Sequence, residues 1–114
     1  MSHDMSHSMS QNETILAFAD ALGRHGMRSA GMSLRVMLAL RFAPVVFVAA
    51  LDEIERDADE HANLSCATAA GMRLPEDEKV QRQRAETFVR LSFVARALRD
   101  NDTVRAAAML AEVP

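Results

Sequence analysis

The chain has 114 residues, of which 49% are hydrophobic and 25% are charged, and its formal net charge is −3. A chain of this length and composition can bury a core, which excludes a disordered or fibrous polymer. Its single cysteine excludes an internal disulfide and a cysteine-rich zinc site, and an acidic chain without a basic block argues against nucleic acid as a partner.

The apolar residues favour helices. Alanine, leucine, valine and methionine supply most of the apolar content, whereas tryptophan and tyrosine are absent. Alanine, leucine and methionine are strong helix formers, and strands are usually richer in aromatic residues. We therefore expect an all-α fold, a compact bundle or orthogonal array of about five helices, built by residues 10–114 as a single α-helical domain.

The chain begins with three related tetrapeptides, MSHD, MSHS and MSQN. If Met1 is retained, the terminal amine, two amides and the His3 imidazole can surround Cu(II) or Ni(II) in a square plane. The alternative is a disordered leader over residues 1–9 with no function, because chain termini are usually unordered unless other contacts hold them. We expect that leader and no cofactor, and His3 remains a candidate metal ligand.

A capping box predicts the first helix. Ser10 and Glu13 stand three residues apart just before an apolar stripe at helical spacing, so a helix is expected from about Gln11 to Arg24. The glycines and serines of HGMRSAGMS then predict a loop, and Ser33 is expected to cap a short second helix.

The most apolar segment runs from Leu34 to Leu51. Arg35 and Arg41 interrupt it, and its longest uncharged run extends only from Phe42 to Leu51, whereas a membrane span needs about twenty residues. We expect no membrane association and interpret the segment as buried core. Pro44 inside it suits the first turn of a third helix.

The third helix is predicted to be amphipathic with an acidic outer face that includes Glu55. Three acids on this face form a candidate docking surface for a basic partner: Glu53, Asp57 and Glu60. Asp57 and His61 are also a candidate metal pair, being four residues apart. The simpler alternative is that they interact locally while His61 lies at the edge of the core.

Pro75 and three acids in the next turn predict a fourth helix that ends near Arg99, and Asp102 is expected to cap a fifth. The second half of the fourth helix is apolar over most of its circumference and is expected to form the centre of the domain, with more apolar surface than a small bundle can cover. It therefore supplies candidate partner-binding residues and leads us to expect a homo-oligomer. These residues are Phe88, Phe93 and Leu98.

A helix-turn-helix unit that binds DNA is the first alternative function. FADALG, residues 18–23, resembles the first helix and turn glycine of such a unit, but Arg24 and His25 follow where an apolar residue is needed. In this alternative a dimer would present Arg24, Arg28 and Arg35 to the duplex. Metal binding through His3 or the edge formed by Glu53, Asp57 and His61 is the second alternative.

No catalytic pattern stands out. Cys66 has no basic neighbour in sequence, and His25 has no local carboxylate or nucleophile. We therefore expect a small, non-enzymatic cytoplasmic protein that acts through contact with another protein, as a regulator, adaptor or inhibitor.

Overall fold

The computed structural model describes residues 10–114, and these residues form five α-helices and no strand. The helices are α1 (Gln11–Arg24), α2 (Arg28–Ala39), α3 (Pro44–Ala70), α4 (Pro75–Arg99) and α5 (Thr103–Leu110). The predicted all-α fold of about five helices is confirmed.

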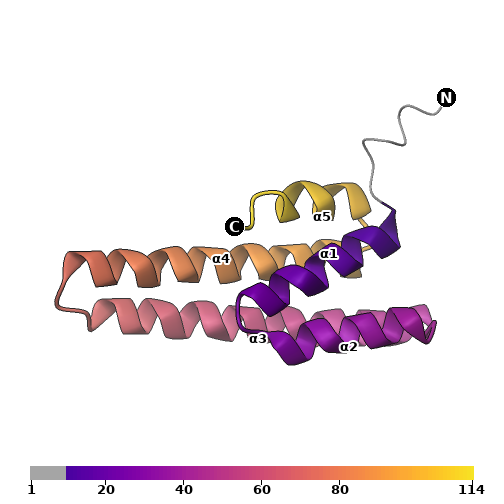
Figure 1. Cartoon of the computed structure of the whole chain (residues 1–114), viewed down its shortest axis with the longest axis horizontal. Helices are drawn as coiled ribbons and strands as arrows, with labels where there is room; N and C mark the ends of the chain where they lie inside the picture. Colours follow the sequence, from indigo (N-terminus) through magenta and orange to yellow (C-terminus); the bar gives the residue numbers. More distant parts are fainter. Residues whose placement is uncertain (1–9) are drawn as a thin grey trace.

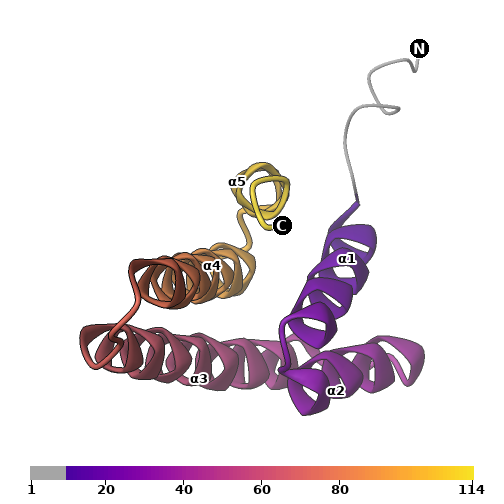
Figure 2. The same cartoon turned by 60° about the vertical axis from the view of Figure 1, so that its left-hand side comes forward.

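A long antiparallel hairpin of α3 and α4 is the frame of the molecule (Figure 1). The shorter helices α1 and α2 form a second antiparallel pair beside it, and α4 lies between α3 and α5 (Figure 2). The part of the hairpin near the α3–α4 turn projects beyond α1, α2 and α5, which explains the elongated extents of 54 × 31 × 20 Å. The other end of the molecule holds the α2–α3 turn.

The helix ends follow local sequence signals. Ser10 and Glu13 form the predicted capping box: the Ser10 N–H donates to Glu13 Oε1 at 2.9 Å, and the Glu13 N–H donates to Ser10 Oγ at 3.1 Å. The hydrogen bond from the Ser10 backbone lowers the pKa of the Glu13 carboxyl. Asp102 caps α5 as predicted, by accepting the Arg105 N–H at 3.1 Å. Pro44 and Pro75 occupy first-turn positions of α3 and α4.

The prediction for the start of α2 was wrong. Helix α2 begins at Arg28 rather than after Ser33, so the loop before it is much shorter than expected. Gly26, at φ +92°, makes the turn, and Gly31 then packs against α1. A Cβ atom on Gly31 would lie 2.5 Å from the carbonyl oxygen of Ala19, so this glycine permits close helix contact rather than ending a helix.

All five helices, together with the C-terminal segment after α5, line one continuous core. Phe18 and Leu22 of α1, Leu34 of α2, and Phe88 and Leu91 of α4 are fully or almost fully buried. Towards the α3–α4 turn the residues buried on the hairpin are small, which lets the two helices approach closely: Ala58, Ala62, Ser65, Ala69 and Ala85.

Candidate interaction surface

An exposed apolar surface lies at the end of the molecule that holds the α2–α3 turn (Figure 1). Five large apolar side chains between residues 36 and 48 are 41% to 72% exposed, and we call them the 36–48 surface: Val36, Leu40, Phe42, Val45 and Val48. The prediction that Leu34 to Leu51 is buried core was therefore wrong over most of its length. Leu34 and Leu51 are buried, but they only frame the exposed part.

The first turns of α3 explain this exposure. The helix starts with the residues PVVFVAAL, which are apolar on every side. Only one side faces the core, where Phe47 is half-buried, and Val45 and Val48 project from the helix into solvent. A helix that is apolar all round is normally buried all round. Within residues 10–114, no element covers the outer side.

A hollow of about 490 Å³ adjoins the 36–48 surface. Its apolar wall comes from four helices and the α2–α3 turn: Ile15, Leu38, Phe42, Phe47, Val48, Leu51 and Leu98. Its polar rim includes Gln11 and Asn101, and the Gln11 amide donates to Asn101 Oδ1 at 3.1 Å. A largely apolar hollow with a few polar groups is suited to receive an apolar side chain or a small apolar molecule.

Charged residues anchor α3 to α4 next to this hollow. Glu55, predicted on the solvated face, is only 7% exposed and lies between two arginines of α4. It accepts hydrogen bonds from Arg96 at 2.7 Å and from Arg99 at 2.5 Å, and Asp52 accepts one from Arg99 at 2.7 Å. Burial by itself lowers the pKa of Arg99, but the Glu55 and Asp52 carboxylates outweigh it and raise that pKa above its usual value.

The predicted partner-binding residues of α4 divide into two groups. Phe88 and Leu98 are buried in the core, so neither side chain is available to a partner of the folded chain. Phe93 is 40% exposed, and the Arg96 guanidinium lies 5.6 Å from the centre of its ring. The helix is apolar on nearly all sides because α3, α1 and α5 each cover one of them.

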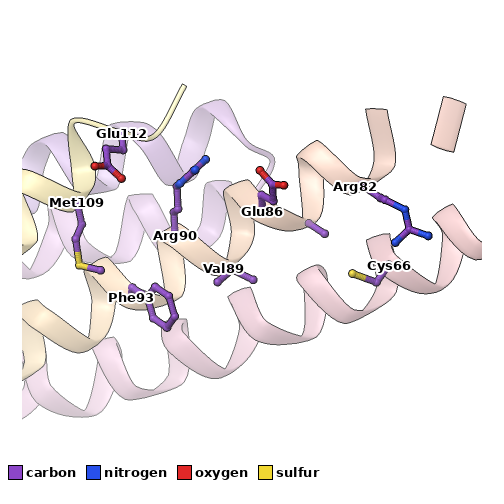
Figure 3. Close-up of a pocket in the computed structure, with 9 residues that line it drawn as sticks. Cys66, Arg82, Glu86, Val89, Arg90, Phe93, Met109 and Glu112 are labelled. Atoms are coloured by element: carbon purple, nitrogen blue, oxygen red, sulfur yellow. The ribbon is translucent and has the colours of Figure 1, made fainter. Parts of the chain in front are cut away.

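Phe93 borders a second hollow of about 510 Å³, away from the 36–48 surface (Figure 3). Figure 3 shows Phe93 and Val89 projecting from α4 between Met109 of α5 and Cys66 of α3. Four charged residues of both signs surround these apolar groups: Arg82, Glu86, Arg90 and Glu112. Cys66 is a free, exposed thiol.

The predicted acidic docking residues lie along α3. Glu53 and Asp57 line a small hollow against α2, of about 220 Å³, together with Ser29 and Ser33. Glu60 is exposed one turn further along. None of these three acids has an ion-pair partner in the part of the chain that the structure describes.

The candidate metal-binding pair of α3, Asp57 and His61, makes contacts within the fold. His61 Nδ1 lies 2.8 Å from the main-chain oxygen of Asp57, and the imidazole packs at 4.9 Å against the Phe88 ring. His61 thus lies at the edge of the core, as the simpler alternative predicted. Among residues 10–114, no three His, Cys, Asp or Glu side chains are grouped so that they could hold a metal ion. His3 lies outside the described residues.

The three arginines of the nucleic-acid alternative come together. Arg24, Arg28 and Arg35 line one hollow of about 390 Å³ between α1 and α2, together with Asp20. Arg24 pairs with Asp20, and Arg35 lies 3.7 Å from the same carboxylate.

None of the five helices described is long and apolar enough to cross a membrane. The chain matches no protein-family model, no curated protein and no solved structure. Its function is therefore inferred from its own residues.

Proposed function

We propose that this protein acts through protein–protein contact, and that its first partner is a second copy of itself, bound through the 36–48 surface. The exposure of five large apolar side chains within so short a segment carries this proposal. Monomeric proteins seldom leave such a group uncovered, and the buried centres of homodimer interfaces are apolar.

The sequence of α3 suits an antiparallel pairing. Val45 and Val48 are three residues apart and lie on the same side of the helix. A two-fold axis that passes between the α3 helices of the two copies, level with the midpoint of Val45 and Val48, places Val45 of one copy against Val48 of the other. An isologous contact requires this arrangement. Arg41, which has no ion pair within residues 10–114, then faces Asp52 of the second copy.

The hollow beside Phe42 and Val48 strengthens this arrangement. An apolar side chain of the second copy can enter it, and binding energy in interfaces is concentrated where a side chain fills such a hollow. Leu40 is the most exposed apolar residue of the α2 end and is the side chain we assign to this role.

The dimer is proposed as a non-enzymatic regulator or adaptor of the cytoplasm, which fits its single, unpaired cysteine. The acids Glu53, Asp57 and Glu60 remain solvated when α3 pairs through Val45 and Val48, because they lie on another side of the helix. They are proposed to dock a further, basic partner.

The test compares two charge insertions of the same kind. Val48→Asp places a carboxylate in the proposed interface and should convert the dimer to a monomer in size exclusion with light scattering. Phe93→Asp places it at the other exposed apolar site and should leave the dimer intact. Circular dichroism checks that both variants keep their helices. If Phe93→Asp dissociates the protein and Val48→Asp does not, the interface lies at the hollow of Figure 3 and the proposal is wrong.

A further inference from the structure

The hollow between α1 and α2 is lined by small residues and bordered by arginines. Two glycines and Ala19 form part of its lining, and three arginines and Met32 surround them. The one carboxylate among its lining residues is that of Asp20, and Arg24 also donates to the main-chain oxygen of Pro114 at 3.2 Å. Arg24 and Arg35 share this carboxylate, whereas Arg28 has no ion pair in the described chain. The hollow therefore holds a local excess of positive charge in a chain whose net charge is negative.

Gly23 leaves the lining of the hollow open on the α1 side. This residue lies in the last turn of α1, which ends at Arg24. The fold does not require it: Gly23 does not have the left-handed backbone of Gly26, and a Cβ atom added to it would have no neighbour within 4 Å. Gly31, in contrast, is required by its contact with Ala19. Because Gly23 has no side chain, a group bound in the hollow can approach the backbone of α1 closely.

We propose that this hollow binds the phosphate group of a small organic phosphate. Guanidinium groups bind phosphate oxygens through paired, charge-assisted hydrogen bonds, and Arg28 is free to make them. Arg24 and Arg35 complete the cationic rim from α1 and α2. Met32, which is exposed at the edge, offers an apolar contact for the organic part.

The size of the hollow favours a small molecule over a nucleic acid. A volume of about 390 Å³ accommodates one phosphate with a modest substituent. Binding along a duplex instead requires basic side chains spread over several successive phosphates, and the three arginines converge on one place.

The experiment titrates the full chain with phenyl phosphate and follows binding by calorimetry. Saturable binding is expected, tighter than that of inorganic phosphate because of the contact with Met32. Arg28→Gln should weaken it about tenfold or more. Arg105→Gln, which removes an equal charge from the exposed surface of α5, should change it less than twofold.

Gly23→Ala separates binding from folding. The added methyl group enters the hollow, so affinity for phenyl phosphate should fall, whereas thermal stability should stay equal or rise. The proposal is overturned if phenyl phosphate does not bind, if Arg105→Gln weakens binding as much as Arg28→Gln, or if Gly23→Ala binds normally. Duplex DNA that binds to the chain and is not displaced by phenyl phosphate would also overturn it. The site is independent of dimer formation, so Val48→Asp should bind phenyl phosphate normally.

Discussion

At the scale of single residues, Gly31 shows how one missing side chain sets a helix contact. Replacing it with alanine improves helix propensity by up to about 1 kcal/mol but drives the new Cβ atom into the Ala19 carbonyl group. Because the Cβ atom is attached directly to the α2 backbone and its neighbour is a backbone oxygen of α1, neither can rotate away and α1 and α2 must separate. We expect Gly31→Ala to lower the free energy of unfolding in urea by about 1–3 kcal/mol. Gly23→Ala is the matched control and should not lower it; equal stabilisation by both substitutions would contradict this description of the contact.

The capping box at Ser10 gives a second prediction at this scale. Ser10→Ala removes the hydroxyl that accepts the Glu13 N–H and should cost about 1 kcal/mol of stability at neutral pH.

The pH dependence of stability checks the same cap. The pKa of Glu13 is lower in the folded chain than its ordinary value of 4.5. Its contribution is therefore fully present above that value and is lost as the pH falls through the lowered pKa. Glu13→Gln should remove this part of the acid-side decline in urea unfolding, and an unchanged decline would contradict the assignment.

Residue-level predictions from the sequence succeeded where the interaction is local. Ser10 with Glu13 and Asp102 with the start of α5 involve partners three residues away, which spacing reveals. Glu55, Phe88 and Leu98 were misplaced because their surroundings are set by other helices. Helical spacing orders residues around one axis but does not say which sides of that helix its neighbours cover.

At the scale of elements, Glu55 couples α3 to α4. Its carboxylate is almost buried between Arg96 and Arg99, so losing its charge leaves both guanidinium groups without their main partner. Glu55→Gln should lower the free energy of unfolding by about 1–3 kcal/mol. Glu53→Gln, on the exposed side of the same helix, should change it by less than about 0.5 kcal/mol. Equal effects of the two substitutions in chemical denaturation would show that the cluster does not stabilise the hairpin.

The helices themselves were predictable, except for the start of α2. The starts of α1, α3, α4 and α5 carry capping residues or proline, and these signals act within one turn. The residue before helix α2 is Met27, which offers no side-chain cap, and Gly31 within the helix is explained only by the neighbouring α1. The hollow lined by Arg24, Arg28 and Arg35 could not be located in advance either, since it depends on how α1 crosses α2.

At the scale of the whole molecule, one end holds the α2–α3 turn with the 36–48 surface, and the other end is a projecting hairpin (Figure 1). The sequence predicted more apolar surface than a small bundle can cover. That prediction placed the uncovered apolar surface on α4. In the fold, α3, α1 and α5 each cover part of the second half of α4, and a group of exposed apolar side chains lies at the α2–α3 turn. The expectation of self-association stays a prediction, and its proposed location moves from Phe88, Phe93 and Leu98 of α4 to the 36–48 surface.

The mass of the wild-type particle tests the central claim most directly. Light scattering coupled to size exclusion, over a concentration series into the high micromolar range, should give twice the 12.5 kDa mass of the chain. The Val48→Asp variant in the same series should give the mass of a single chain. A wild-type protein that remains a monodisperse monomer at the highest concentration would contradict the account.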